Sequence, residues 1–486
     1  MSPPRLDRRS FLRAGAGAVA AAAGSRLAAR APTDPLPSYL ADVDGNGVVD
    51  AVDAALMRQA VFTARGFQIT PNVGFDYRAD VFGQGVVDQT SADAVADAVA
   101  ASARGELRSQ PRPVTVAWHY SWYDQRQRPL LLQTARYLGG DYLSDDPVVE
   151  TEFNQLKNEL GITVDALSWI PPRVTPTILP NIAAGYFGAA NAATRYVSLI
   201  YENTLALPQV GGRIDFRDAR VAELLVADFA AMAATLVEAR DRYPTRVFLM
   251  AGRPVLFVFG SHSWGRDPAD TIEFDRMAAV VGEARAAFAA VYGTQPFLVG
   301  DELLSIASTA EPSPDRVSRA RNFEAVYAYH AANLKTAARP FAMNEEYGAL
   351  QRLRLVRAAD AVRALRNRHT GSRLLIIPSL AGGFAKHALP TLTATRSAFA
   401  DYLAVLTRYY TETYLPEEWA GGLGTAALPA PVYTVGSWNE EYEGHAVFPA
   451  AFNLALPDPE QGGFDYGLAL RQAFGWNHYA FRDIVP

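Results

Sequence analysis

Cysteine is missing from this chain of 486 residues. Its absence excludes disulfide bonds, thiolate metal sites and a cysteine nucleophile. Basic residues do not dominate the charge either, because 45 Lys and Arg stand against 51 Asp and Glu, for a net charge of −6. Nucleic-acid binding needs clustered Lys and Arg, so we expect no nucleic-acid partner.

The sequence also lacks several motifs that mark particular enzyme classes. It has no His-Glu-x-x-His, and its seven histidines are scattered without metal-ligand spacing. It has no Gly-x-Ser-x-Gly nucleophile elbow, no phosphate-binding glycine-rich loop that ends in Lys-Ser/Thr, and no Gly-x-Gly-x-x-Gly after an early strand. Zinc proteases, α/β-hydrolases, P-loop enzymes and dinucleotide-binding enzymes are therefore poorly supported.

Residues 1–31 have the pattern of an export signal. Residues 7–13 (Asp-Arg-Arg-Ser-Phe-Leu-Arg) resemble a twin-arginine motif, and the apolar run that follows, residues 14–24, is too short to anchor the chain in a bilayer. Residues 29–31 (Ala-Arg-Ala) offer a cleavage site. We expect a secreted, extracellular protein with no membrane span after signal removal; a disordered basic tail is the alternative.

A calcium-type loop follows between residues 42 and 53. Gly47 at its sixth position permits the sharp turn. Oxygen ligands would come from positions one, three, five, seven, nine and twelve, which are Asp42, Asp44, Asn46, Val48, Asp50 and Asp53. A related loop, residues 80–91, repeats Gly-Val-Val-Asp but departs at Phe82, Gln84 and Ser91, so we expect no metal there.

The paired loops resemble a dockerin, the duplicated calcium-binding module of secreted carbohydrate-degrading enzymes. This resemblance implies a small all-α module over residues 37–106 and a structural Ca²⁺ in the first loop, and it makes a cohesin-type scaffold a candidate partner. A pair of surface Asx-turns without metal is the alternative. A proline-containing linker at residues 110–113 then leads to the larger domain, residues 113–486.

The larger domain alternates short apolar runs with helical stretches. The runs predict eight strands, at residues 114–120, 163–169, 196–201, 254–260, 296–300, 325–329, 373–379 and 432–435. Longer helices are predicted at 150–160, 221–243, 272–291, 346–368 and 395–414. Strand–helix alternation indicates parallel strands, and eight of them favour a (β/α)8 TIM barrel, with a doubly wound open sheet as the alternative.

Chemistry in such a barrel collects where the strands end. The predicted ends are rich in aromatic, imidazole and carboxylate side chains, which suit sugar rings and their hydroxyls. The predicted glycan-binding set is His119, Tyr120, Trp122, Tyr123, Trp169, Glu202, Glu302, Tyr329, His330, Trp438, Tyr442 and His445. His262 and Asp301 also lie at predicted strand ends.

The end of the eighth strand carries three carboxylates, Glu440, Glu441 and Glu443. Glu440 and Glu443 are three residues apart, so one turn of backbone can aim both at one glycosidic bond. They are the predicted catalytic residues, and a solvated acidic loop is the alternative. A similar string, residues 344–347 (Asn-Glu-Glu-Tyr), is interpreted instead as a helix N-terminus capped by Asn344.

Six stretches together resemble glycoside hydrolase family 99, the endo-α-mannosidase-like barrels. They are residues 119–123 (His-Tyr-Ser-Trp-Tyr), 142–149 (Tyr-Leu-Ser-Asp-Asp-Pro-Val-Val), 161–169 (Gly-Ile-Thr-Val-Asp-Ala-Leu-Ser-Trp), 252–255 (Gly-Arg-Pro-Val), 377–379 (Ile-Pro-Ser) and 439–444 (Asn-Glu-Glu-Tyr-Glu-Gly). Two places depart from the family pattern. Residues 441–442 (Glu-Tyr) replace Trp-His, and residues 381–384 (Ala-Gly-Gly-Phe) replace a Pro-Gly turn.

The resemblance implies a retaining endo-acting α-glycosidase, most simply one that cleaves α-mannosidic linkages in a polysaccharide. It assigns Glu443 as general acid and then base toward water. It assigns Glu440 as the base that deprotonates the sugar's own 2-hydroxyl, giving a 1,2-anhydro intermediate. No cofactor is implied for catalysis. The alternatives are a non-catalytic glycan-binding or scaffold-docking protein, and a polysaccharide-assembly enzyme of the same fold.

Overall fold

The computed structural model describes most of the predicted barrel and part of the N-terminal region. The described residues are 41–43, 48–64, 89–107, 113–123, 135–137, 141–307, 311–329, 341–342, 345–380, 384–386, 389–393, 402–403, 406–407, 409–418, 430–440, 447, 450–453 and 470. The predicted export signal lies outside this set. Among the described helices none is long and apolar enough to cross a membrane.

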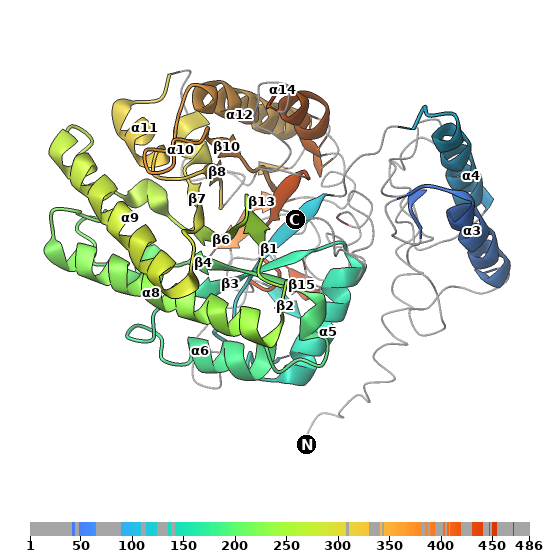
Figure 1. Ribbon diagram of the computed structural model, residues 1–486, viewed down its shortest axis with the longest axis horizontal. Coiled ribbons are helices and arrows are strands. Elements are labelled where there is room, and N and C mark those ends of the chain that lie inside the picture. Colours follow the sequence, from blue (N-terminus) through green and yellow to red (C-terminus); the bar gives the residue numbers. More distant parts are fainter. Residues whose placement is uncertain are drawn as a thin grey trace.

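Two helices make up the described N-terminal part, α3 (Ala51–Ala64) and α4 (Gln89–Ala103). They lie side by side (Figure 1) and share a buried cluster that includes Met57 of α3 and Val95 of α4. In α4 the buried residues are Ser91, Ala92, Val95 and Ala98, a spacing of three to four that marks one helix face. A helical pair therefore follows from the pattern, while its dockerin-like identity remains a prediction.

Parallel strands form the centre of the larger part of the chain (Figure 1). In chain order they are β1 (Val114–His119), β3 (Val164–Trp169), β4 (Tyr196–Tyr201), β6 (Arg253–Val258), β7 (Phe297–Asp301), β8 (Ala325–Tyr327), a seventh strand in two pieces, β10 (Leu375–Ile376) and β11 (Ser379–Leu380), and β14 (Val432–Val435). All eight predicted strands are present, and those at 196–201 and 432–435 have the predicted bounds.

Each strand pairs in parallel with the next one along the chain, and the eighth strand, β14, pairs with β1. The split seventh strand joins the two ends of this series: β10 pairs with β8, and β11 pairs with β14. The Ile377 N–H donates to the Val326 carbonyl at 2.9 Å, and the Pro378 carbonyl accepts from the Thr434 N–H at 2.9 Å. This order has no reversal of strand sequence, so the sheet is a TIM-like α/β barrel and not the doubly wound alternative.

Helices cover the outside of the strands (Figure 1). The long ones are α5 (Pro147–Glu159), α8 (Ala219–Arg242), α9 (Thr271–Tyr292) and α12 (Glu345–Arg363), all at predicted positions. The predicted helix at 395–414 is described only from residue 402, where it includes the π-helical turn η6 (Tyr410–Tyr414) and leads into α14 (Leu415–Glu418). Asn344, the predicted cap of α12, lies outside the described residues.

Local sequence explains where these helices begin and end. Asp146 caps α5 by accepting from the Val148 N–H, and Asp270 caps α9 by accepting from the Glu273 N–H. Gly293 ends α9 with a φ of 99°, which favours glycine. The α8 helix buries Val221, Leu225, Phe229, Met232 and Leu236, at a spacing of three to four residues, against the outer face of β3 and β4.

Shorter elements fill the connections. They are β2 (Ala135–Tyr137), α6 (Ile178–Asn181), η3 (Ile182–Tyr186), η4 (Ala192–Thr194), α7 (Asn203–Ala206), β5 (Leu249–Met250), η5 (Ser261–Ser263), α10 (Leu303–Ala307), α11 (Pro314–Ala320), β9 (Phe341–Ala342), β12 (Phe384–Lys386), β13 (Leu389–Thr393) and β15 (Ala450–Asn453). Two small sheets form outside the barrel, β12–β13–β9 and β15–β2.

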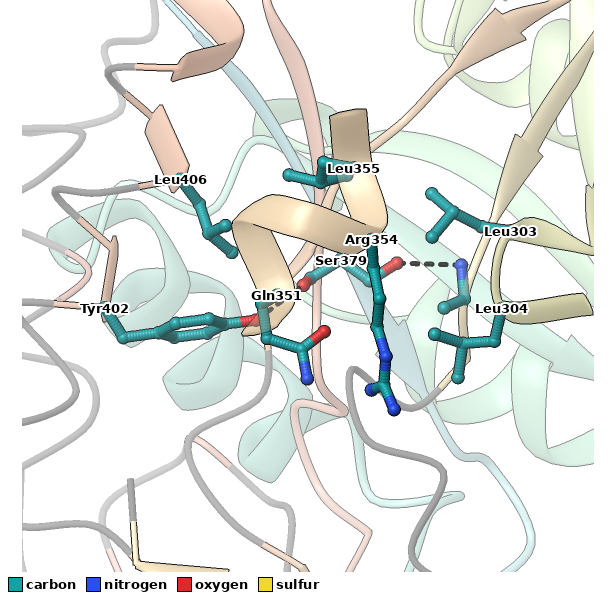
Figure 2. Close-up of a pocket in the computed structure, with 9 residues that line it drawn as sticks. Leu303, Leu304, Gln351, Arg354, Leu355, Ser379, Tyr402 and Leu406 are labelled. Carbon is teal, nitrogen blue, oxygen red and sulfur yellow. Dashed lines mark hydrogen bonds between the residues drawn. The ribbon is translucent and has the colours of Figure 1, made fainter. Parts of the chain in front are cut away.

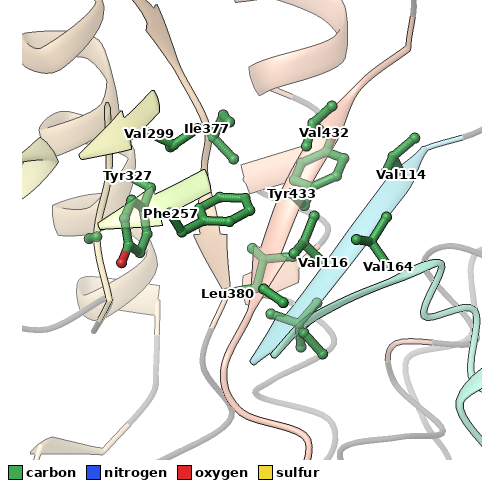
Figure 3. Close-up of a cluster of buried hydrophobic side chains, with 14 of the residues drawn as sticks. Val114, Val116, Val164, Phe257, Val299, Tyr327, Ile377, Leu380, Val432 and Tyr433 are labelled. Carbon is green, nitrogen blue, oxygen red and sulfur yellow. The ribbon is translucent and has the colours of Figure 1, made fainter. Parts of the chain in front are cut away.

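Alternation along the strands divides the core into an inner and an outer layer. Inside, Trp118 packs edge-on against Phe257, with ring centroids 5.0 Å apart, and lies 5.2 Å from the Tyr327 ring. Figure 3 shows Phe257 and Tyr327 with aliphatic residues of the same buried cluster, such as Val116 and Val299. The barrel interior is therefore a packed aromatic floor beneath the carboxyl ends of the strands.

Candidate active site

The chain leaves β14 and turns across the carboxyl end of β1. The Trp438 N–H donates to the Trp118 carbonyl at 2.6 Å, and the Glu440 N–H donates to the Ser437 hydroxyl at 2.9 Å. Glu440 is 2% exposed. These bonds fix the backbone of a nearly buried carboxylate at the barrel end where TIM-barrel chemistry occurs.

Asn439 ties this turn to the segment after β1. Its side-chain Oδ1 accepts from the Tyr120 N–H at 2.8 Å, while its Nδ2 donates to the Tyr120 carbonyl at 2.9 Å and to the Tyr142 hydroxyl at 2.9 Å. Its own carbonyl accepts from the Tyr123 hydroxyl at 2.7 Å. Asn439 is fully buried, so none of these bonds competes with bulk water.

Three predicted aromatic residues come together beside this turn. Tyr120 and Tyr329 are joined through their hydroxyls, and the Tyr120 ring stacks on Trp122 with centroids 4.3 Å apart. Trp122 keeps part of its surface exposed, whereas Tyr120 and Tyr329 are buried. The arrangement places an accessible indole over two tyrosines at the end of β1, a surface on which a sugar ring can stack.

Glu202 lies at the end of β4, where its Oε1 accepts from the Ser168 hydroxyl at 3.0 Å. Burial raises the pKa of the Tyr327 phenol well above its ordinary value, and the carboxylates of Asp301 and Glu202 raise it further. Both carboxylates are therefore near the Tyr327 hydroxyl, which points toward the carboxyl ends of the strands in Figure 3. Glu202 belongs to the polar layer directly above the aromatic floor.

Glu302 contacts the helical layer instead. It is fully buried, and its carboxylate pairs with the Arg319 guanidinium of α11 at 3.2 Å. Burial raises the pKa of Glu302, and the nearby Arg319 charge opposes that rise. The ion pair therefore links the end of β7 to α11.

The other predicted aromatic and imidazole residues contact helices. Trp169 donates through its indole N–H to the Thr235 hydroxyl of α8 at 3.3 Å. Trp438 packs edge-on against Phe153 of α5 at 5.5 Å. His119 lies 3.2 Å from Glu150 and 2.9 Å from the Lys157 ammonium, both on α5. The alternation of side chains along a strand explains this placement, because each strand sends every second residue outward.

His119 is one edge of a buried charge cluster between the strands and α5. Asp165 on the outer face of β3 accepts from Arg195 at 2.9 Å and Tyr186 at 2.8 Å, and pairs with Lys157 at 3.0 Å. Burial alone would raise the pKa of Asp165, but Arg195 and Lys157 reverse this and hold it well below its ordinary value. Burial lowers the pKa of Lys157.

Several predicted site residues lie outside the described part of the chain. They are the catalytic residue Glu443, the glycan-binding residues His330, Tyr442 and His445, and the calcium ligands Asp44 and Asn46. The Glu440–Glu443 pair therefore remains a prediction.

In the N-terminal loop, the Asp53 carboxylate joins the described segments on either side of residues 44–47. Its Oδ1 accepts from the Val43 N–H at 2.6 Å, and its Oδ2 accepts from the Asp50 N–H at 2.9 Å. The carboxylate is fully buried and holds the two described ends of the loop together, which fits a ligand at position twelve. Within the described residues no three acidic or imidazole side chains form a metal-binding group.

Asn439 and the pair His262–Asp301 are the site residues that the predicted set omitted. The signal for Asn439 was its position directly after a buried strand, next to Glu440. His262 and Asp301 stood at predicted strand ends but were not selected. The contact between His262 and Asp301 forms because β6 and β7 are neighbouring strands. The sequence indicates that these strands are neighbours only if a barrel is assumed.

One small cavity lies between α10, α12 and the seventh strand, where β7 and β8 end (Figure 2). About 10 Å³ is open to the centre of a water-sized sphere, room for about one water. It is lined by Leu303, Leu304, Ala328, Gln351, Arg354, Leu355, Ser379, Tyr402 and Leu406, and Figure 2 shows the Ala328–Ser379 hydrogen bond in its wall. It is far too small for a sugar ring.

Comparison with known proteins gives similarities to solved structures only. No family model matches the chain, and no curated protein matches it. The GH99 endo-alpha-mannosidase from Bacteroides thetaiotaomicron is 17% identical with a TM-score of 0.43, over 75% of this chain and 97% of that one. A glycoside hydrolase-like protein is 13% identical with a TM-score of 0.48, over 75% and 94%. A fungal beta-1,4-galactanase is 8% identical with a TM-score of 0.39, over 74% and 99%.

Proposed function

We propose that this protein is a retaining endo-acting α-glycosidase that cleaves α-mannosidic linkages in a polysaccharide or glycan. The observation that carries the proposal is the placement of Glu440. This nearly buried carboxylate follows the eighth strand of a TIM-like barrel, on a backbone fixed by Asn439 to the aromatic cluster of Tyr120 and Trp122. The six family-like stretches of the sequence supply the choice of reaction and of linkage.

In this proposal Glu440 deprotonates the 2-hydroxyl of the sugar, and that oxygen displaces the leaving group at the anomeric carbon. Glu443 donates a proton to the departing glycosidic oxygen, then removes one from the water that opens the 1,2-anhydro ring. When the 1,2-anhydro ring opens, Glu440 returns its proton to the 2-oxygen. Each step therefore moves one proton onto one carboxylate and one off the other, and water is the only co-reactant. Two displacements at one carbon retain its configuration. Glu202 and the Trp122 surface would hold the sugar by hydroxyl contacts and stacking.

The test compares wild type with Glu440→Gln and Glu443→Gln on α-linked manno-oligosaccharides of defined linkage. A positioned acid or base contributes about 10²–10⁴-fold to the rate, so each variant should lose that much in kcat. Glu238→Gln is the matched control, because Glu238 is an exposed helix residue paired with Arg242. Wild-type rates in both site variants would refute the proposal, and binding without turnover by the wild type would favour a glycan-binding protein.

We also propose that the protein is exported by the twin-arginine route and that its first N-terminal loop binds a structural Ca²⁺. The buried Asp53 carboxylate, which already bridges the two described loop ends, supports the calcium site. Calorimetric titration of the full chain with Ca²⁺ should show binding that Asp53→Ala abolishes. Asp93→Ala, an exposed change on α4, should bind as the wild type does.

A further inference from the structure

Where β6 ends, the chain presents two side chains that keep exposed surface. Phe259 is half-buried, and His262 on the short helix η5 has a side chain that is 51% exposed. Gly260 between them has a φ of 65°, and a Cβ there would lie 2.6 Å from the Thr204 methyl group. This glycine lets the chain turn sharply away from the strand, so that His262 stands at its carboxyl end.

Asp301, at the end of β7, contacts both Gly260 and His262 of this turn. Its Oδ2 accepts from the Gly260 N–H at 3.2 Å and lies 3.4 Å from the His262 Nδ1. Its Oδ1 accepts from the Tyr329 N–H at 3.0 Å. A carboxylate fixed by two backbone bonds sets the orientation of the imidazole, so that Nδ1 faces Asp301 and Nε2 faces away.

The carboxylates near His262 raise the pKa of its imidazole, and burial opposes that rise. The hydrogen bond to Asp301 raises the pKa of His262 most, and the nearby Glu302 carboxylate also raises it. Arg213 approaches from the preceding connection, where its guanidinium donates to the His262 carbonyl at 3.2 Å. His262 is therefore a donor at Nε2 over a wider range of pH than an ordinary histidine.

Phe259 supplies an apolar surface next to this donor. Its ring packs edge-on against Tyr329, with centroids 4.5 Å apart, and Tyr329 joins Tyr120 through the hydroxyls. An aromatic face beside an oriented hydrogen-bond donor suits a sugar, whose C–H groups stack while its hydroxyls bond. Trp122 stacks on Tyr120, on the other side of the Tyr120–Tyr329 pair, and offers a second aromatic surface.

Phe259 and His262 lie far from Glu440 in the strand order of the barrel. In the order of parallel strands, β6 is the fourth and β14 the eighth, so they lie opposite each other. A ligand that reaches both Glu440 and His262 must cross the mouth of the barrel. One sugar ring does not span such a mouth, whereas a chain of several does.

We infer that Phe259 and His262, oriented by Asp301, bind a sugar residue remote from the bond that is cleaved at Glu440. This inference rests on the proposed glycosidase function and extends it, because a remote contact selects internal positions of a polymer over short oligosaccharides. His262 determines specificity through its bond to a sugar hydroxyl. Asp301 is a positioning residue that acts through His262.

The experiment compares cleavage of α-linked manno-oligosaccharides of increasing length by wild type, His262→Gln and Phe259→Leu. For the longest substrates KM should rise about tenfold, the loss expected for one hydrogen bond to a charged donor. The kcat should stay unchanged, and the shortest cleavable substrate should show no rise in KM. Asp301→Asn should weaken binding less, and His369→Gln, next to Asn322 at the amino end of β8, should leave KM unchanged.

Two results would overturn the inference: unchanged KM for long substrates, or an equal rise in KM at every length. The pH dependence gives a separate readout. In the wild type, KM for long substrates should rise as the pH increases through the elevated pKa of His262, and His262→Gln should lose that dependence.

Failure of the proposed function is distinguishable from failure of this inference. If the wild type cleaves none of the substrates, calorimetry measures binding of the longest one to wild type and to His262→Gln. Weaker binding by the variant would retain the inference and reject the enzyme. Equal binding, or no binding by either protein, would reject the inference.

Discussion

Replacing Asn439 tests whether the turn that carries Glu440 is held as the structure indicates. In Asn439→Ala the Tyr120 N–H and the Tyr120 carbonyl lose their partners, and both are buried. A buried polar group left unpaired costs about 1–3 kcal/mol, so two such groups should lower the free energy of unfolding by about 2–6 kcal/mol. The Tyr142 hydroxyl also loses a donor.

Tyr123→Phe should cause a smaller loss of stability at the same turn. It removes one hydrogen bond, from the Tyr123 hydroxyl to the Asn439 carbonyl, and should cost about 1 kcal/mol. Asn439→Asp keeps the size and the acceptor for the Tyr120 N–H but cannot donate to the Tyr120 carbonyl. It also adds a negative charge next to Glu440, which should raise the pKa of Glu440 and shift the acidic limb of the kcat profile upward.

Urea unfolding followed by tryptophan fluorescence measures the first effect, and pH–rate profiles measure the second. The free energy of unfolding should decrease in the order wild type, Tyr123→Phe, Asn439→Ala. Asn439→Ala with the stability and activity of the wild type would show that the three side-chain hydrogen bonds of Asn439 do not hold the turn.

Three further changes test other parts of the account. Asp165→Asn removes the carboxylate that pairs with both Arg195 and Lys157 in a fully buried cluster, so it should cost about 3–5 kcal/mol in urea unfolding. Glu238→Gln, at the exposed Arg242 pair, should cost under about 1 kcal/mol. Equal losses in the two variants would contradict the burial argument. Burial, with help from Arg285, lowers the pKa of His369 from 6.5 to about 4. The unfolded chain therefore binds more protons between these values, and stability should fall as the pH decreases from about 6.5 to about 4, a dependence that His369→Gln should reduce. Gly260→Ala places a methyl group against Thr204 at a φ of 65°, so it should destabilise the turn after β6 and raise KM for long substrates. Gly371→Ala is the control for backbone strain alone, because a Cβ at Gly371 meets nothing within 4 Å.

The strand positions were predictable because buried parallel strands appear as short apolar runs between helical patterns. The seventh strand differs from its prediction in being split: β10 and β11 flank Ile377 and Pro378, and Pro378 has no N–H to donate to a neighbour. The closure of the barrel was not a property of any one segment. It depends on hydrogen bonds between residues such as Thr434 and Pro378, which are far apart in the chain.

The sequence predicted which residues lie at strand ends, but it did not predict which face of the strand each side chain lies on. Tyr120, Trp122 and Tyr329 come together at one end of the barrel, but His119 and Trp169 contact helices. Residue type alone does not separate these groups, since a histidine suits both a sugar site and a buried ion cluster. The face is decided by strand alternation, and one residue of shift in a predicted strand reverses it.

The most direct test of the central claim is the product formed from an α-linked manno-oligosaccharide, followed by proton NMR from the first minutes of reaction. The account predicts that the wild type releases the α-anomer first, by cleavage inside the chain, and that Glu440→Gln forms it at about 10²–10⁴-fold lower rate. Initial release of the β-anomer, or wild-type rates from Glu440→Gln, would contradict the assignment of Glu440 as the base of a retaining glycosidase.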